Sequence, residues 1–150
     1  MDIDYILYNT FPDAQILDGI TKLHNTIFND ADKLIKQMKS KPNLIVNVAL
    51  DGAIVIGYKI GYSLTDTKFY SWLGGVDTTY RNLGVAAKLM EEQHRYLKAN
   101  GYQLIQTKTM NRWRNMLILN IKSGFDIVGT YIDENGETKI IMEKELSTED

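Results

Sequence analysis

Apolar and polar residues follow two rhythms along the chain. Alternation, together with β-branched and aromatic clusters, predicts strands over residues 3–8, 44–50, 53–64, 68–76, 102–107, 125–132 and 138–145. Apolar residues three or four apart predict a helix opened by Pro12 and further helices over about 30–38, 83–100 and 112–122. This element order predicts a mixed α/β (α+β) fold, with a mostly antiparallel sheet and one parallel pair around the helix 83–100.

Glycines mark turns and irregular points in this pattern. Asp51-Gly52 separates two strand patterns and predicts a two-residue hairpin turn. Gly57 and Gly61 lie inside a predicted strand, where glycine indicates a β-bulge or a close approach of another backbone. We therefore expect the strand 53–64 to be irregular.

Composition indicates one globular domain over residues 1–150. Hydrophobic residues make up 44% of the chain, which has only two prolines and no visible repeat or linker. The net charge of −2 predicts no nucleic-acid partner. Lys33, Lys36, Lys39 and Lys41 cluster, but they alternate with apolar residues and predict a solvated helix face.

The chain has no sequence signal for a membrane. No apolar run approaches the roughly 18 residues that cross a bilayer. The start of the chain lacks the basic residues and apolar stretch of a signal peptide. We expect a cytoplasmic protein. The oligomeric state stays open, with a homodimer as the commonest soluble assembly.

Candidate catalytic side chains of the familiar kinds are scarce. The chain contains no cysteine, which excludes disulfides, cysteine-ligated zinc and a thiol nucleophile. His24 and His94 each stand without a neighbouring histidine or acidic ligand pattern. We therefore expect neither a metal site nor a catalytic histidine.

The most distinctive segment joins the strand 68–76 to the helix 83–100 through an Arg-x-x-Gly-x-Ala turn at residues 81–86. Gly84 falls at the helix start, where backbone N–H groups have no intrahelical partner. A small residue there leaves these groups open to a ligand, and the helix dipole favours an anion. The turn suits a pyrophosphate, although a glycine at a helix start is also often a steric convenience.

Two well-known phosphate loops, Gly-x-x-x-x-Gly-Lys-Ser/Thr and Gly-x-Gly-x-x-Gly, are absent. The pattern that remains, Val-x-x-x-Tyr-Arg-x-x-Gly-x-Ala-x-x-Leu from Val76 to Leu89, resembles the acyl-CoA-binding motif of the GNAT superfamily of N-acyltransferases. The usual motif has a proline where this chain has Thr78. In element order the resemblance covers residues 44–146 and includes Gly124-Phe125, which in the family opens the penultimate strand.

The resemblance implies a GNAT-like sheet of about six to seven strands with about four helices, in which a splayed parallel strand pair forms the CoA cleft. It implies acetyl-CoA as co-substrate and no metal. The implied cofactor-binding residues are Gly75, Val76, Asp77, Arg81, Asn82, Leu83, Gly84, Val85, Ala86 and Asn115. Gly74-Gly75 also suits a β-bulge, and Arg81 also suits a solvated surface charge.

The chain departs from the family at the proton carriers. Many members have a glutamate base on the CoA-binding strand, where this chain has Ser71, and a tyrosine acid before the Gly-Phe, where it has Asn120. Ser71 and Asn120 are therefore candidate catalytic positions, both atypical. We still predict an active enzyme, because a positioned acid or base contributes only about 10²–10⁴-fold. Proximity can correspond to about 10⁵–10⁸ M of effective molarity.

The function implied is direct transfer of an acetyl group from acetyl-CoA to an amine of a small molecule or peptide. The alternative is a non-catalytic acyl-CoA-binding or sensing domain of the same fold. In the family the acceptor lies between the N-terminal helices and the C-terminal hairpin. Core packing is the expected role for most aromatic residues of those parts: Phe28, Tyr58, Tyr70, Trp72, Trp113 and Tyr131.

Overall fold

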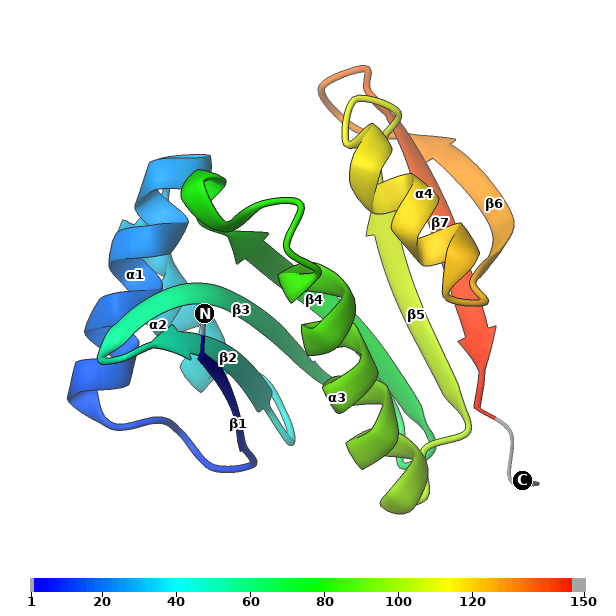
Figure 1. The fold of residues 1–150 in the computed structure, drawn as a ribbon. Coiled ribbons are helices and arrows are strands. Elements are labelled where there is room, and N and C mark those ends of the chain that lie inside the picture. The colour runs from blue at the N-terminus through cyan, green and yellow to red at the C-terminus, as the bar shows by residue number, and fades with distance from the viewer. Residues whose placement is uncertain (1, 147–150) are drawn as a thin grey trace.

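The computed structural model describes residues 2–146, which form one seven-stranded sheet with helices on both faces (Figure 1). The strand order is β1-β2-β3-β4-β5-β7-β6. The strands are β1 (Ile3–Tyr8), β2 (Ile45–Asp51), β3 (Ile54–Ser63), β4 (Lys68–Val76), β5 (Leu104–Thr109), β6 (Asp126–Ile132) and β7 (Thr138–Glu145). The helices are α1 (Ala14–Phe28), α2 (Leu34–Lys39), α3 (Val85–Ala99) and α4 (Arg114–Lys122). The pair β4–β5 is parallel and the others are antiparallel, so the predicted fold is confirmed.

Helix α1 begins at Ala14, two residues later than the proline pattern predicts. Asp13 is its N-cap, and the Asp13 carboxylate accepts a hydrogen bond from the N–H of Ile16 at 3.0 Å. Pro12 therefore precedes the helix, and its expected place inside the first turn is wrong. At the other end Asn29 adopts a left-handed conformation, with φ 57°, and stops α1.

Each face of the sheet has its own core. On one face α1 and α2 cover β2 and β3, and Ile20 of α1 packs in the same cluster as Tyr58. On the other face Val85 and Leu89 of α3 pack against Ala49 of β2. Helix α4 lies on the same side as α3, over β5 and β7 (Figure 1). The sheet thus separates two sets of helices, α1 and α2 on one face and α3 and α4 on the other.

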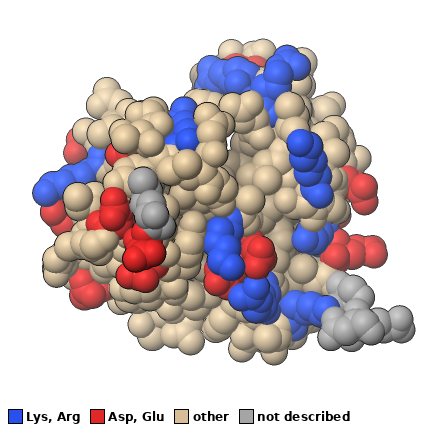
Figure 2. Space-filling view, viewed as in Figure 1, with Lys and Arg blue, Asp and Glu red and all other residues tan. Residues whose placement is uncertain are grey.

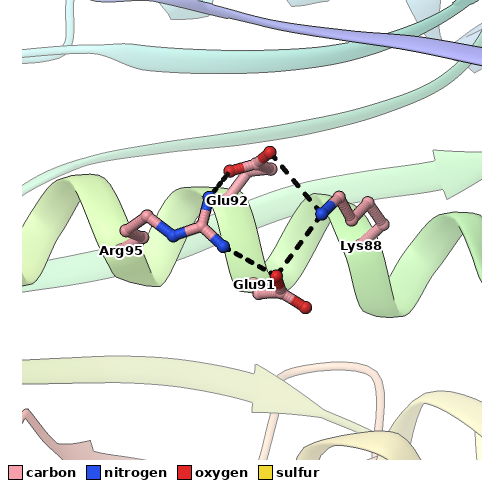
Figure 3. Close-up of polar contacts among 4 residues, drawn as sticks. All are labelled: Lys88, Glu91, Glu92 and Arg95. Carbon is pink, nitrogen blue, oxygen red and sulfur yellow. Dashed lines mark hydrogen bonds and ion pairs between the residues drawn. The ribbon is translucent and has the colours of Figure 1, made fainter.

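The solvent side of α3 is covered by ion pairs (Figure 3). Arg95 reaches Glu91 at 2.7 Å and Glu92 at 2.6 Å, and Lys88 reaches the same two carboxylates at 3.4 Å and 3.8 Å. Such exposed pairs each stabilise a helix by only about 0.3–0.5 kcal/mol. Their charges balance, and both signs are spread over this face of the molecule (Figure 2).

Two further properties of residues 2–146 limit the kinds of site. None of the helices in this part of the chain is long and apolar enough to cross a membrane. Nor do three or more histidine or acidic side chains within it gather where they could hold a metal ion.

His24 is buried, and its two ring nitrogens lie within hydrogen-bond distance of the Tyr58 hydroxyl and the Asp30 carboxylate, at 2.5 Å each.

Candidate active site

The parallel strands β4 and β5 pair over a short stretch. Their register runs from Lys68 opposite Leu104 to Ser71 opposite Thr107, although β4 continues to Val76. Beyond this last rung the two strands diverge (Figure 1). The edge of β4 that faces away from β3 therefore carries backbone groups that an extended ligand can pair with. The predicted splayed pair is present.

A β-bulge in β4 lies directly beside the last rung. Ile60 of β3 is opposite Leu73, and Gly61 is opposite Ser71, so Trp72 is an extra residue on β4. A bulge leaves its extra residue out of the ladder and bends the strand. The bend falls where β4 leaves β5, so the same irregularity that widens the gap also exposes backbone there.

Two glycines near the bulge are required by close packing. A Cβ at Gly61 would lie 2.3 Å from the ring of Phe69 and 2.5 Å from the carbonyl oxygen of Tyr70. The close approach predicted at Gly61 is confirmed. A Cβ at Gly75 would lie 2.5 Å from Cδ1 of Ile27 in α1. Gly75 thus serves the packing of α1, and the bulge suggested for this position lies earlier in β4.

The turn between β4 and α3 ends in a helix start with free N–H groups. Asp77 caps the 3₁₀ turn Thr78–Tyr80 and accepts a hydrogen bond from the N–H of Thr79 at 2.9 Å. Asn82 and Gly84 then adopt left-handed conformations, with φ 66° and 77°. No side chain within residues 2–146 caps α3, and a Cβ at Gly84 would meet nothing within 4 Å. The first turn is open to an anion.

A cavity of about 510 Å³ lies beside this turn. Its lining comes from the end of α1, the β4–α3 turn and the residue before α4: Thr26, Ile27, Asp77, Thr78, Thr79, Arg81 and Trp113. Phe28 and Trp113 meet edge to face with ring centroids 6.0 Å apart, which connects α1 to the start of α4. Figure 2 shows the surface hollowed between the two halves of the molecule at the top of the view.

Most predicted cofactor residues lie around this cavity and turn. Asp77 and Arg81 line the cavity, and Arg81 is exposed, with its Nε donating to the carbonyl oxygen of Val76 at 3.3 Å. This contact leaves the rest of the guanidinium available to a ligand. Arg81 is therefore both an exposed surface charge and part of the cavity lining, so the two interpretations given for it are compatible.

Four other predicted cofactor residues differ in their exposure and in their distance from the cavity. Leu83 is 54% exposed and Ala86 is half-buried, on either side of the helix start. The side chain of Val85 packs into the core, so only its backbone can meet a ligand. Asn115 is exposed on the first turn of α4 and lies outside the cavity lining.

The two candidate catalytic positions lie close to the last rung. The carbonyl of Ser71 accepts a hydrogen bond from Oγ1 of Thr107 at 2.9 Å. Nδ2 of Asn120 lies 3.7 Å from Sδ of Met142, and Met142 is paired with Thr107. Ser71 and Asn120 are both buried and lie on either side of this pair. Neither side chain exchanges a proton near neutral pH.

Lys59, on the α3 side of the sheet, is a candidate site residue that the sequence pattern did not indicate. Lys59 of β3 is paired with Asn47 of β2 and Gly74 of β4. Burial lowers the pKa of the Lys59 ammonium to about 8, because the charged form is poorly solvated there. Strand alternation places Lys59 on the same face as Gly61, which is the partner of Ser71. A group that titrates near neutral pH thus shares a face with the last rung.

Polar atoms near Lys59 lack partners. The amide oxygen of Asn47, both amide atoms of Gln93 and Nε2 of His94 are buried without a hydrogen-bond partner in the described part of the chain. Burial, Lys59 and Lys144 lower the pKa of His94 to about 3, so His94 is neutral at pH 7. Its Nδ1 lies 3.1 Å from Nζ of Lys144. The signal for this cluster was a charged residue within the otherwise apolar pattern of β3.

The aromatic residues divide between core and surface. Tyr58 is 1% exposed, as core packing predicts. That expectation is wrong for Phe28, Trp113 and Tyr131, which are 36%, 41% and 39% exposed. Phe28 ends α1 and Trp113 precedes α4, and both lie at the opening between β4 and β5, whereas Tyr131 lies near the end of the outer strand β6.

These features define a class of molecule: an open mixed sheet whose one parallel pair splays apart, with an uncapped helix start at the opening. No protein-family model and no curated protein matches the chain. Solved structures do match, and the fold they share is that of the GNAT acetyltransferases.

Three of these structures show the extent of the likeness. An aminoglycoside 6'-N-acetyltransferase complexed with coenzyme A has a TM-score of 0.79 at 14% identity, covering 95% of this chain and 97% of the other. A ribosomal-protein alanine N-acetyltransferase from Escherichia coli has 0.79 at 14%, covering 96% and 95%. A GNAT family acetyltransferase from Elizabethkingia anophelis with acetyl-CoA bound has 0.75 at 19%, covering 96% and 98%.

Proposed function

We propose that the protein is an acyl-CoA-dependent N-acyltransferase that moves an acetyl group from acetyl-CoA to an amine of a small molecule or peptide. The observation that carries the proposal is the parting of β4 and β5 after Ser71 and Thr107, with an uncapped helix start at the opening. The shared GNAT fold, with CoA or acetyl-CoA bound in two of the similar structures, supports it.

The free groups of the chain fit the two ends of this co-substrate. The open edge of β4 from Trp72 to Val76 suits the amides of a pantetheine arm, which can pair with it as an added strand does. The first-turn N–H groups beside Gly84 suit the pyrophosphate, and Arg81 adds a positive charge. Backbone groups make most of these contacts.

Bound acetyl-CoA would supply an activated acetyl group. In a direct transfer the amine nitrogen forms a bond to the acetyl carbon while the C–S bond breaks, and the departing CoA thiolate takes up, through water, the proton that the amine loses. The chain has no cysteine that could form a thioester intermediate. The bulge leaves Trp72 outside the ladder, so backbone at this point is available to polarise a carbonyl oxygen. Positioning supplies the main effect, since proximity corresponds to about 10⁵–10⁸ M and a proton carrier to about 10²–10⁴-fold. The enzyme therefore works with Ser71 and Asn120 at the usual carrier positions.

Ser71 and Asn120 also favour one alternative function. A domain that binds acyl-CoA without transferring the acyl group needs no proton carrier, and neither of these side chains provides one. Such a domain would keep the open strand edge and the helix start. Binding and turnover must therefore be measured separately.

Calorimetry with CoA, and release of free CoA from acetyl-CoA over a panel of amines, separate these functions. The transferase predicts CoA binding together with amine-dependent release. Binding without release for any amine would support the non-catalytic domain. A folded protein that binds neither CoA nor acetyl-CoA would contradict both.

A further inference from the structure

The face of the sheet opposite α3 carries aromatic side chains where β4 and β5 part. Tyr70 and Trp72 are the sequence neighbours of Ser71, and Lys108 follows Thr107. Thr107 is paired with Met142, which packs in the core under α4, so the neighbouring Lys108 points to the opposite face. The side chains of Tyr70, Trp72 and Lys108 therefore lie on the face opposite α3, next to the last rung of the β4–β5 pair.

The rings on this face form a continuous surface. Tyr62 lies 5.5 Å from Tyr70 and 5.7 Å from Trp72, measured between ring centroids. Nζ of Lys108 lies 5.9 Å from the ring of Tyr70 and 5.3 Å from that of Tyr131 on β6. We refer to Tyr62, Tyr70, Trp72 and Tyr131 as the aromatic face. It joins the two halves of the sheet across the divergent strands.

Lys41 borders the same face from the other side. Its Nζ lies 4.8 Å from the ring of Tyr62 and 5.1 Å from that of Trp72. The solvated helix face predicted for this lysine is wrong, because Lys41 lies beyond α2 and contacts the rings. Within residues 2–146, neither Lys41 nor Lys108 has an ion-pair partner. The aromatic face thus carries two positive charges without counter-ions.

Several carboxylates of this side already have partners. Asp30 contacts Nε2 of His24 at 2.5 Å, and Asp133 forms an ion pair with Lys139 at 3.8 Å. Glu143 forms an ion pair with Lys68 at 3.2 Å and accepts a hydrogen bond from Gln106 at 2.9 Å. Together with Asp126 and Glu145 it lines a separate hollow of about 220 Å³, toward the closed end of the β4–β5 pair. A polycationic acceptor at the aromatic face would meet two ammonium groups instead of carboxylates.

We propose that the acceptor is an amine carrying a carboxylate on an aromatic or apolar body, bound on the aromatic face with its carboxylate at Lys108 or Lys41. This inference rests on the proposed transferase function. The rings take the apolar body, and the two lysines supply the missing counter-charge. Nearby ammonium groups also disfavour the charged form of the acceptor amine, which reduces the need for a base at Ser71.

The test compares free tyrosine with tyramine, which keeps the ring and the amine but lacks the carboxylate. We expect kcat/KM to favour tyrosine by about tenfold or more, as for a hydrogen bond to a charged group. Lys108→Met and Lys41→Met should each reduce the tyrosine-to-tyramine ratio, and the double variant should bring it near one. Lys108→Arg should retain the preference. Lys36→Met, on the exposed surface of α2, is the matched control.

The outcomes separate the two proposals. Turnover of spermidine or tyramine in preference to tyrosine would overturn the acceptor assignment and leave the transferase intact. A ratio unchanged in the double variant would also overturn it. If no amine is acetylated, calorimetry of tyrosine on the CoA-loaded protein decides: binding weakened by Lys108→Met but not by Lys36→Met supports the assignment, and no binding contradicts it.

Discussion

At the last rung of the β4–β5 pair, the two faces of the sheet offer a ligand different kinds of contact. The α3 side presents mostly backbone: the open edge of β4 and the N–H groups at Gly84. The opposite side presents side chains, which are four rings and two ammonium groups. Backbone contacts suit the co-substrate, whose chemical structure is fixed. Side-chain contacts suit the acceptor, because a few residues can select which acceptor binds. The variants below alter one face at a time.

The largest expected effect comes from closing the helix start. Gly84→Val adds a branched side chain at φ 77° and covers the first-turn N–H groups. We expect the CoA dissociation constant to rise about 1,000-fold, the loss of about two hydrogen bonds to a charged group. Gly101→Val is the control, because Gly101 has φ 88° and open space but lies at the far end of α3. Unchanged affinity in a folded Gly84→Val protein would exclude this pyrophosphate site.

A second prediction concerns the amine that reaches the gap. Without a base at Ser71, an acceptor must arrive neutral, and an α-amine is roughly a fifth to a third neutral at pH 7.4. A lysine ε-amine is only about 0.1% neutral at that pH. In a peptide that carries both groups, we expect α-acetylation to exceed ε-acetylation about 100-fold, measured by mass spectrometry of the product. Preference for the ε-amine would show that a base acts elsewhere in the cleft.

Lys59 gives the α3 side a pH-dependent cost in stability. Its folded-state pKa of about 8 lies below the ordinary value of 10.5. Below pH 8 the lysine is charged in both states and the full cost of burial applies. Between pH 8 and 10.5 the folded protein loses the proton first, so stability rises. Lys59→Met should therefore stabilise the protein at pH 7 by about 3 kcal/mol, which is the free energy that corresponds to the lowered pKa.

Urea unfolding of wild type and Lys59→Met at pH 7 and pH 10 measures this cost. The difference between the two proteins should shrink at the higher pH. Lys144 is common to both proteins. Lys59 is one of the causes that lower the pKa of His94, but burial is the larger cause, so we expect His94 to stay neutral at pH 7 and pH 10 in both proteins. Lys122→Met, an exposed position on α4, is the control. A difference that stays constant with pH would contradict the assigned ionisation.

The smallest effect is expected at Asn120. Its amide contacts Met142 and cannot donate a catalytic proton, so Asn120→Ala should lower kcat by about tenfold at most. Steady-state kinetics with CoA affinity measured in parallel tests this. A 10⁴-fold loss with structure and affinity intact would give Asn120 a direct chemical role. Lys122→Ala, at an exposed position of the same helix and outside the predicted sites, is the matched control.

The fold was predictable because its signals are local. Each strand and helix has its own periodicity, and the Arg81–Ala86 turn combines a helix start with a small residue at Gly84. The bulge at Trp72 was misplaced because it depends on how Gly61 of another strand packs against Phe69. Packing between two strands does not alter the hydrophobic periodicity of either strand, so it cannot be predicted from that periodicity.

The site was predictable only on its backbone side. Gly84 and Arg81 could be found from spacing within one segment. The aromatic face comes from three separate strands, β3, β4 and β6, and Lys41 joins it from the connection before β2. Lys41 looks solvated when it is compared only with its sequence neighbours. The contact of Lys41 with the rings depends on which strands are neighbours in the sheet. The periodicity of a single sequence does not reveal that order.

The open edge of β4 affects how this chain can diverge from others of its fold. An amide edge is the same whichever side chains it carries, so substitutions that keep the path of the strand keep its hydrogen bonds. The path of this strand depends on a few glycines and a turn more than on the identity of each side chain. Chains of this fold can thus retain TM-scores of 0.79 and 0.75 to this protein at only 14% and 19% identity.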